Sequence, residues 1–447
     1  STTIKAIAVK EGMADSEVAT FNYTINITGT DTKVGGGGGG GGPVPTLIPT
    51  PAPVQPNKVE NGKVTTIPVL DASSKQASAS ISSDDIKNAL SNAEADENGI
   101  KVVGISVQKV DGASGYVQEI PFEELTKAEN SQNLKITTEL GSVTAPSNML
   151  AETAGNGQKV SLAIVKADSS GIAPDVAAQI GTRPVVELNV KVDGSALSWS
   201  NEEAPVAISI PYAPSSEEKS APEHITVLYI NSSGAVSPVP SARYDSTTGQ
   251  VTFKTTHFSK YAVAFVEKTF EDMDQYGWAK NSVEIMASKG VINGTSAASY
   301  TPGASVKRGD FMLLLVKALG LTAKPDGRFA DVNDSDYYAG AIAVARKLGI
   351  AKGSGDGRFN PQDSITRQDM MTLIERAMKV AGKKMSVSSG TELDAFGDRE
   401  KVAEYAKDSV AALVKNGIVT GSGNNINPMG NATRAETAVL IYRIYNK

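Results

Sequence analysis

The feature that constrains this chain most is an internal repeat that begins after residue 267. A phenylalanine opens each of three copies, at Phe270, Phe329 and Phe396. An aspartate follows two residues later, at Asp272, Asp331 and Asp398. A proline comes 32 residues and an arginine 38 residues after each phenylalanine, and the arginines are Arg308, Arg367 and Arg434. Such constant offsets do not arise by chance and indicate three copies of one structural unit.

Each copy is predicted to contain two helices. The first has an aromatic start, at Trp278, Tyr338 or Tyr405, and a glycine stops it at Gly290, Gly349 or Gly417. The second begins at a capping box in two copies, because Thr366 and Thr433 are each followed three residues later by an acid. Lys307 replaces the threonine in the first copy, so that helix start is expected to be weaker.

Helix capping explains the threonines and acids of these motifs but not the arginines. An arginine at the first helical position meets the positive end of the helix dipole, at a cost of about 0.3 to 1 kcal/mol. Keeping it at one register in three copies predicts a partner carboxylate for each arginine. The residues alone leave open whether that carboxylate belongs to the protein or to a ligand.

The repeats resemble the S-layer homology (SLH) domain over about 180 residues. The matching features are Phe-x-Asp at each start, the Trp/Tyr-Ala helix opening, the Gly-Val/Ile helix end, the Phe/Tyr-x-Pro loop and Thr-Arg-x-Asp/Glu. The resemblance implies an all-α pseudo-trimer of three helix-loop-helix repeats, at about 270–322, 329–383 and 396–447. One helix of each copy would join a central bundle. Grooves between the lobes would bind secondary cell wall polymer, typically through a pyruvylated N-acetylmannosamine end.

Carried over by position, the resemblance implies ligand roles for four sets of residues. The arginines would hold the acidic sugar, and Asp272, Asp331 and Asp398 would orient hydroxyls or brace an arginine. The aromatic residues Trp278, Tyr338 and Tyr405 offer faces for stacking a sugar, with core packing as the alternative. Gly294, Gly353 and Gly421 let the backbone approach a ligand or simply turn the chain. The first copy departs from the capping motif, so removal of Arg308 is expected to matter less than removal of Arg367 or Arg434.

The rest of the chain divides at a linker. Residues 35–42 are eight consecutive glycines followed by a proline-rich stretch, which predicts a linker over residues 30–57. Residues 1–29 contain two strand patterns, at 3–9 and 19–27, and resemble the end of a chitobiase/β-hexosaminidase C-terminal-type β-sandwich repeat. Residues 58–266 alternate in short strands and predict one or two β-rich spacer domains with antiparallel, sandwich-like sheets.

Composition removes several kinds of chemistry. The chain has no cysteine and two histidines among 447 residues, which excludes thiolate sites and leaves little for histidine catalysis. A net charge of -6 disfavours nucleic acid as a partner, and no apolar run approaches the length of a membrane span. Residues 331–336 begin like a calcium loop, but Asp336 stands where the loop needs glycine. We therefore expect no metal, no cofactor and no membrane insertion.

These observations predict an extracellular, multidomain protein of a Gram-positive-type cell surface or S-layer, with the repeats as a non-covalent cell wall anchor. The expected partner is a wall-linked acidic glycan, with other S-layer subunits as a further candidate. Two alternatives stay open: the chain is the tail of a surface enzyme acting on glycans, or the repeats assemble a lattice through protein contacts. His257 is the candidate for a catalytic group in the middle region, but no motif surrounds it, so we expect no enzymatic activity.

Overall fold

The structure is a computed structural model that describes residues 2–6, 19–23, 56–96, 99–153, 155 and 157–447. Strands β1 (Thr2–Ala6) and β2 (Ala19–Tyr23) pair antiparallel. The turn predicted between them and nearly all of the predicted linker lie outside the described residues. The resemblance of this segment to a chitobiase-type repeat stays a prediction. Gln55–Lys447 forms a separate compact unit, and the following paragraphs concern that unit.

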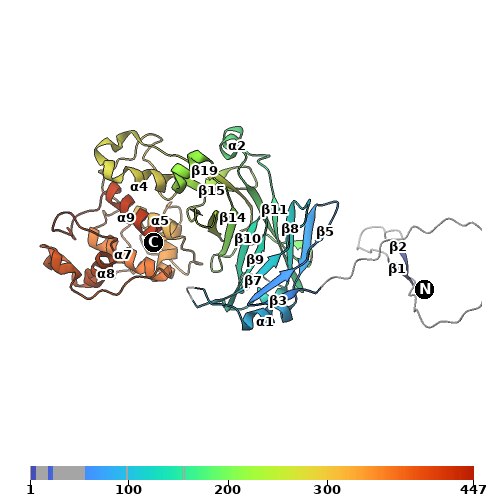
Figure 1. The fold of residues 1–447 in the computed structure, drawn as a ribbon. Helices are drawn as coiled ribbons and strands as arrows, with labels where there is room; N and C mark the ends of the chain where they lie inside the picture. Colours follow the sequence, from blue (N-terminus) through green and yellow to red (C-terminus); the bar gives the residue numbers. More distant parts are fainter. Residues whose placement is uncertain (1, 7–18, 24–55, 97–98, 154, 156) are drawn as a thin grey trace, which may run out of the picture. The chain divides into compact units, whose positions relative to one another are not determined.

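The first half of this unit contains two β-sheets (Figure 1). One sheet has the strand order β17-β18-β14-β10-β9-β7-β4-β3. Its strands are β3 (Lys58–Glu60), β4 (Lys63–Thr66), β7 (Lys101–Val107), β9 (Gln132–Thr138), β10 (Gly141–Pro146), β14 (Val206–Pro211), β17 (Arg243–Asp245) and β18 (Gln250–Thr255).

The second sheet has the order β16-β15-β19-β12-β11-β8-β6-β5, with β13 paired to β12. Its strands are β5 (Val69–Leu70), β6 (Gln76–Ser80), β8 (Gly115–Pro121), β11 (Lys159–Lys166), β12 (Val185–Val192), β13 (Ser195–Ala196), β15 (Ile225–Ile230), β16 (Val236–Pro238) and β19 (Lys260–Phe265). Short helical segments connect some of the strands: α1 (Ser83–Ser91), η1 (Phe122–Glu124), α2 (Pro174–Ile180), α3 (Ser216–Ser220) and η2 (Pro222–His224).

The prediction of a β-rich, sandwich-like region is confirmed, but the expectation of purely antiparallel sheets is wrong. The pairs β4–β7, β7–β9 and β6–β8 run parallel, so both sheets are mixed. The reason is the path of the chain, because β6, β7, β8 and β9 alternate between the two sheets. A strand that returns to its sheet after crossing the other one runs in the same direction as its predecessor. Alternating apolar residues could not show this, since they mark one buried face in either direction.

The two sheets share one hydrophobic core. Val186, Leu188 and Val190 of β12 are buried, as their alternation predicts, and so are Val103 and Ile105 of β7 in the other sheet. Burying the apolar faces of both sheets against each other is the arrangement of a sandwich. On the other side of the second sheet, a smaller hydrophobic cluster buries Leu228 of β15 and Ala262 of β19 with Ile180 of α2.

The second half of the unit is helical, as predicted. Each repeat contributes a first helix, α4 (Gly277–Ser288), α6 (Ala339–Lys347) or α8 (Lys407–Lys415), and a second helix, α5 (Arg308–Leu319), α7 (Arg367–Val380) or α9 (Arg434–Tyr445). Short 3-10 segments precede α4 and α8: η3 (Glu271–Tyr276), η4 (Glu392–Ala395), η5 (Arg399–Lys401) and η6 (Glu404–Ala406). None of the helices among the described residues is long and apolar enough to cross a membrane.

The repeats close into a ring through their backbones. The Val306 N–H donates to the Ala432 carbonyl at 3.0 Å, Ile365 donates to Val306 at 3.0 Å, and Ala432 donates to Ile365 at 3.1 Å. Each of these residues stands two positions before a helix-start arginine. The ring therefore brings the starts of α5, α7 and α9 around one axis, with α5 packed against both other helices.

The helices of the three repeats pack on one another in a cyclic order. The first helix of each copy packs on the second helix of the preceding copy: α6 on α5, α8 on α7, and α4 on α9. A lobe is thus built from two neighbouring repeats, so a single repeat could not bury its own apolar face.

The helical region also contacts the β-rich region. The Arg243 guanidinium donates to the Tyr445 carbonyl at 2.7 Å and lies 3.9 Å from the centre of the Tyr445 ring. The Tyr445 hydroxyl donates to the Ala242 carbonyl at 2.6 Å. Lys289, only 2% exposed at the end of α4, donates to the Ile225 carbonyl. These contacts join the C-terminal ends of α4 and α9 to the β-rich region.

Candidate functional site: grooves between the repeats

Two helix-start arginines have a carboxylate partner within the protein. Arg308 Nη1 lies 3.1 Å from Asp369 Oδ2, and Arg367 Nη1 lies 2.7 Å from Glu436 Oε1. In both pairs the acid stands at the third position of the next repeat's second helix. The question that the sequence left open is therefore answered for these two residues, because the ion pair crosses from one repeat to the next.

Arg434 has different partners. Its Nη2 donates to the Asn293 carbonyl at 2.7 Å, and its guanidinium lies 4.4 Å from the centre of the Tyr300 ring. Within the described ranges it forms no ion pair. All three arginines share one contact, since each Nε donates to a loop carbonyl of the neighbouring repeat: Phe359, Ile426 and Tyr300. These bonds offset the unfavourable position of a cation at a helix start.

The caps at the three helix starts differ. Thr433 and Glu436 form the complete capping box that the sequence predicts. At Thr366 the hydroxyl accepts from the Asp369 N–H, but the Asp369 carboxylate is turned to Arg308 and Tyr405 instead. The predicted box is therefore only half formed there. Lys307 has no side-chain cap bond, as expected.

The three repeat aspartates hold the loop that precedes each second helix. Asp331 accepts from the Phe359 and Asn360 N–H groups at 2.9 and 2.8 Å. Asp272 and Asp398 accept from the equivalent backbone groups of their own repeats. Burial raises the pKa of Asp272, but hydrogen bonds from Ser299 and from two N–H groups outweigh it and hold the pKa below its usual value. These bonds account for the aspartates without a ligand, and their predicted contact with a sugar stays a prediction.

The aromatic residues at the first helices fall into two groups. Trp278 and Tyr405 are 60% and 55% exposed, so their faces are open for stacking. Tyr338 is 3% exposed and packs in the core, whereas its neighbour Tyr337 is 69% exposed. Tyr337 donates to Asp310 just as Tyr405 donates to Asp369. Tyr337 thus occupies the outward position. Its offset of eight residues from Phe329 equals that of Trp278 from Phe270, whereas Tyr338 shares the offset of nine residues that Tyr405 has from Phe396, so spacing alone did not separate the two tyrosines.

The repeat glycines are explained by close packing. A Cβ on Gly353 or Gly421 would lie 2.8 or 2.6 Å from the phenylalanine that opens the repeat, and both residues have a φ near +70°. A Cβ on Gly294 would also lie 2.6 Å from Phe270. Turning the chain against a buried ring requires glycine at all three positions.

Two grooves collect the predicted residues. Groove A, of about 570 Å³, is lined by Arg308, Gly353, Asp369, Arg376 and Tyr405, among others. Groove B, of about 490 Å³, is lined by Trp278, Arg367, Gly421, Glu436 and Arg443, among others. Each groove therefore combines an aromatic face, an Arg–carboxylate pair, a close-packed glycine and a further arginine. Burial and the bond to Asp369 raise the pKa of Tyr405 to about 12, so its hydroxyl remains a donor at neutral pH.

Arg376 and Arg443 line the grooves but lie outside the motifs that the sequence pattern singled out. Both stand nine positions after a helix-start arginine, which a comparison of the repeats beyond the capping motif could have found. Asp369 and Glu436 had been assigned to helix capping alone.

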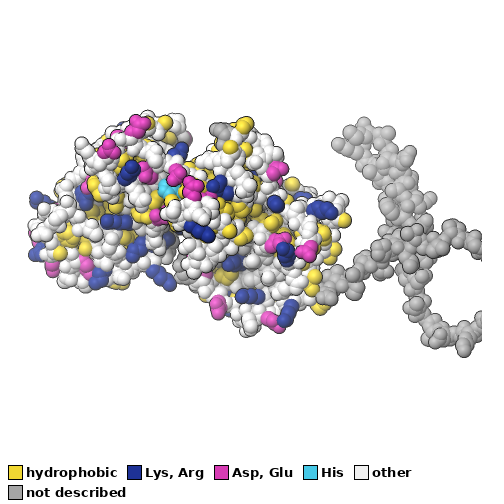
Figure 2. All heavy atoms as spheres, turned by 45° about the horizontal axis from the view of Figure 1, so that its top comes forward, with side chains coloured by type: hydrophobic (Ala, Val, Ile, Leu, Met, Phe, Trp, Pro, Cys, Tyr) yellow, Lys and Arg dark blue, Asp and Glu magenta, His cyan; other side chains and the backbone are white. Residues whose placement is uncertain are grey.

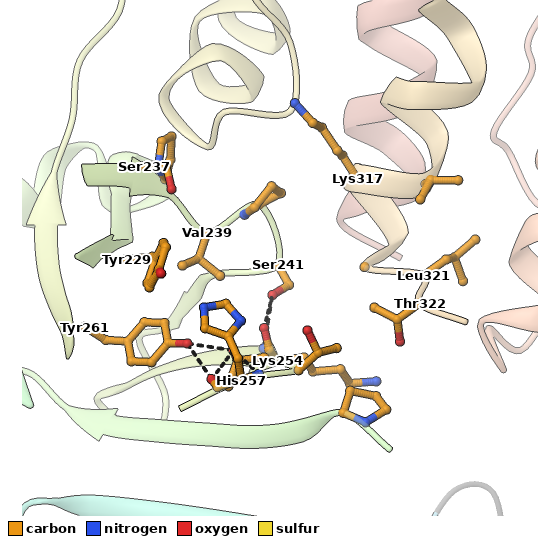
Figure 3. A pocket seen from close by; sticks show the side chains of 17 residues that line it. Tyr229, Ser237, Val239, Ser241, Lys254, His257, Tyr261, Lys317, Leu321 and Thr322 are labelled. Atoms are coloured by element: carbon orange, nitrogen blue, oxygen red, sulfur yellow. Dashed lines mark hydrogen bonds between the residues drawn. The ribbon is translucent and has the colours of Figure 1, made fainter. Parts of the chain in front are cut away.

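His257 lies in a separate pocket of about 300 Å³ between the β-rich region and α5. Figure 3 shows its ring between Tyr261 and Ser241, with Lys317 across the pocket. The described lining contains no Asp or Glu that could orient the imidazole for catalysis. Burial lowers the pKa of His257, and its Nε2 has no hydrogen-bond partner there. Over the described ranges, no cluster of three or more His, Asp or Glu residues could hold a metal ion.

The comparison with known proteins agrees with the repeat pattern. The family model of the S-layer homology domain matches residues 269–312, 328–371 and 395–438. An amylopullulanase of Thermoanaerobacterium thermosulfurigenes is 30% identical over 325 residues, which is 72% of this chain and 17% of that protein. The exoglucanase XynX of Acetivibrio thermocellus is 35% identical over 181 residues, 40% of this chain and 16% of that protein. The S-layer protein sap of Bacillus anthracis is 31% identical over 181 residues, 40% of this chain and 21% of that protein.

The chain thus spans about a fifth or less of the length of these relatives. Two of these relatives carry the names of glycan-degrading enzymes and one carries that of an S-layer protein. Segments similar to the repeats therefore occur in proteins of different names. S-layer homology domains bind cell wall polymers and are found in cell surface proteins. The region after residue 267 consists of three tandem S-layer homology domains, which imply a surface protein anchored to the cell wall.

Proposed function

We propose that the three domains anchor the protein non-covalently by binding an acidic, pyruvylated secondary cell wall polymer in grooves A and B. The observation that carries the proposal is the common layout of the two grooves, each with an exposed aromatic face beside an inter-repeat Arg–carboxylate pair. An aromatic face stacks on a sugar ring, and a guanidinium binds a carboxylate through charge-assisted hydrogen bonds.

The charge of the surface supports specific grooves rather than a general attraction to anions. Figure 2 shows Lys and Arg side chains scattered among Asp and Glu over the visible face. A net charge of -6 would repel a polyanion at long range. Binding would therefore depend on the few cations that face each groove.

The experiment is co-sedimentation of the full chain with purified cell walls. We expect the chain to pellet with walls that retain their secondary polymer and to stay in the supernatant with walls stripped by hydrofluoric acid. Equal pelleting with both kinds of wall would contradict the proposal. The matched variant is Arg308→Ala/Arg367→Ala, which should pellet least.

The relatives favour a second candidate for the whole protein, namely a glycan-degrading enzyme for which this chain is the tail. We propose that the chain itself has no hydrolytic activity. The described residues include no carboxylate pair in a recognisable glycosidase arrangement, and the pocket at His257 is lined by no acid. Release of reducing ends from starch, xylan or peptidoglycan, abolished by one Asp or Glu substitution within residues 58–266, would contradict this.

A further inference from the structure

A second cation recurs on the second helix of every repeat. Lys317, Arg376 and Arg443 each stand nine residues after the helix-start arginine of their own helix. Each donates to a backbone carbonyl at the end of the first helix of its repeat: Gly290 at 3.4 Å, Ile350 at 3.3 Å and Ile418 at 2.8 Å. The same register and the same kind of contact in three copies indicate a fixed position for the charge.

Helix geometry places this cation in the groove. Asp369 and Arg376 are seven residues apart on α7, which is two turns and about 10 Å along the axis, so they share one face of the helix. Leu373 lies between them and lines groove A with both. Glu436, Leu440 and Arg443 repeat this arrangement in groove B. Each groove therefore has an Arg–carboxylate pair at one end, a leucine side chain in the middle, and a second arginine at the other end.

The charges at the two ends are not equivalent. At the end of each groove near the start of α7 or α9, the helix-start arginine is neutralised by Asp369 or Glu436. At the other end, neither Arg376 nor Arg443 forms an ion pair with any residue that the structure describes. Both side chains are half-buried, so water screens them less than a surface cation. Groove A is also lined by Lys352 and Asp363, both of which are exposed. Arg376 and Arg443 are therefore the half-buried cations without an ion pair that the two grooves have in common.

We propose that Arg376 and Arg443 bind an anionic group of the glycan about 10 Å from the Arg–carboxylate pair, so that each groove selects an acidic saccharide longer than one sugar. This inference rests on the proposed function of the grooves and names the ligand class and the residues that select it. The aromatic face and the Arg–carboxylate pair hold one sugar. The second arginine then meets a carboxylate or phosphate further along the chain.

The test compares Arg376→Gln/Arg443→Gln with Lys317→Gln in binding of the full chain to purified walls. Lys317 is the matched control, because it has the same register but faces the pocket beside the β-rich region rather than groove A or B. We expect each groove substitution to weaken binding about tenfold, the loss of one charge-assisted contact, and the control to bind like the parent. The salt dependence of binding should also fall in the double Gln variant and not in the control.

The carbonyl contacts of Arg376 and Arg443 also support the fold, so every variant is first compared with the parent by calorimetry. Arg376→Lys/Arg443→Lys keeps the charge and should retain binding within about threefold. Should the Gln variants melt early, their binding is measured below the temperature at which they begin to unfold. A folded Gln variant that still binds about tenfold more weakly than the parent supports the inference, and one that binds like the parent contradicts it.

Amidation of the wall carboxylates separates the two sources of anion. It also removes the pyruvyl carboxylate bound beside the Arg–carboxylate pair, so it should weaken the parent and the double Gln variant alike through that contact. If the second anion is a carboxylate, the Gln substitutions should cost less affinity on amidated walls than on native walls. An equal cost on both kinds of wall identifies a phosphate. A parent that distinguishes native from stripped walls, with a folded double Gln variant that binds equally well, would overturn this inference and leave the anchoring proposal intact.

Discussion

The first repeat and the other two repeats put the same helix face to different uses. The outer faces of α7 and α9 border grooves A and B. On α5, by contrast, Lys317 borders the pocket shared with the β-rich region, opposite Tyr229 and Val239 (Figure 3). A repeat pattern thus predicts a helix and its charges, but the neighbour in space decides whether that face is open.

The arginines show the same contrast. Arg308 and Arg367 each reach the acid of the next repeat, but Arg434 reaches backbone carbonyls of the first repeat. Asp310, which stands where Asp369 and Glu436 stand, accepts from Tyr337 instead. Near-identical motifs therefore build two grooves that contain an inter-repeat ion pair. At the third junction between repeats, the described residues form no such ion pair.

The largest expected effect is the loss of affinity for the wall glycan when a helix-start arginine is replaced. Arg367→Ala should weaken binding to the wall glycan by one to two decades, because it removes a charge-assisted bond worth about 1.5 to 3 kcal/mol. Arg308→Ala should act similarly. Arg434→Ala should cost less than about threefold, since Arg434 makes no inter-repeat ion pair among the described residues. Binding isotherms of variants that melt near the parent's temperature check this.

This order differs from the ranking expected from the capping motif, which put Arg308 last. A larger loss at Arg434 than at Arg308 would favour the sequence-based ranking over the groove geometry. Equal binding by all three folded variants would mean that the arginines only brace the ring of repeats.

The second effect concerns the buried contact of the first repeat with the β-rich region. Burial, with Arg243 nearby and Glu223 opposing, lowers the pKa of Lys289 to about 7 from 10.5. Tyr445 is the further titratable group beside Arg243. Above pH 7 the folded state holds Lys289 neutral, whereas the unfolded chain still binds its proton. The free energy of unfolding should therefore rise with pH between about 7 and 10, by up to about 1.4 kcal/mol per pH unit.

Lys289→Met should flatten that rise relative to the parent, as measured by chemical denaturation at several pH values. Lys280→Met, at an exposed position on the same helix, is the control and should leave the slope unchanged. An identical slope for the parent and Lys289→Met would show that the lysine is not held neutral in the interface.

The smallest effect concerns the helix caps. Lys307→Thr would give α5 the hydroxyl that Thr366 and Thr433 give to α7 and α9, and should raise the free energy of unfolding by about 1 kcal/mol. Thr433→Ala should lower it by a similar amount, because it breaks a complete capping box. Denaturant midpoints measure both changes, and a destabilised Lys307→Thr would show that the lysine's bond to Gln362 matters more than the missing cap.

The sequence predicted most of the helical region because its constraints are local. Glycine positions, capping threonines and the spacing of Phe270, Phe329 and Phe396 place the helices directly. It could not show that each first helix packs on the preceding repeat, because that pairing depends on the backbone ring through Val306, Ile365 and Ala432. The parallel strands of the β-rich region were missed for a related reason, since alternation marks a face and not a direction.

The candidate site was predicted in part. Arg308, Arg367, Trp278 and Tyr405 were picked out by motif position and do line the grooves. Tyr338 was chosen over Tyr337 because two adjacent tyrosines fit one motif and only tertiary packing tells which is buried. The partners Asp369 and Glu436 had a sufficient local explanation as caps, which hid their role across the repeat boundary.

The most direct measurement of the central claim is calorimetric titration of the full chain with a pyruvylated N-acetylmannosamine disaccharide from the wall polymer. The account predicts saturable binding at grooves A and B, reduced at one groove by Arg308→Ala, at the other by Arg367→Ala, and abolished when both are replaced. Binding by the folded Arg308→Ala/Arg367→Ala variant that equals the parent's would contradict it.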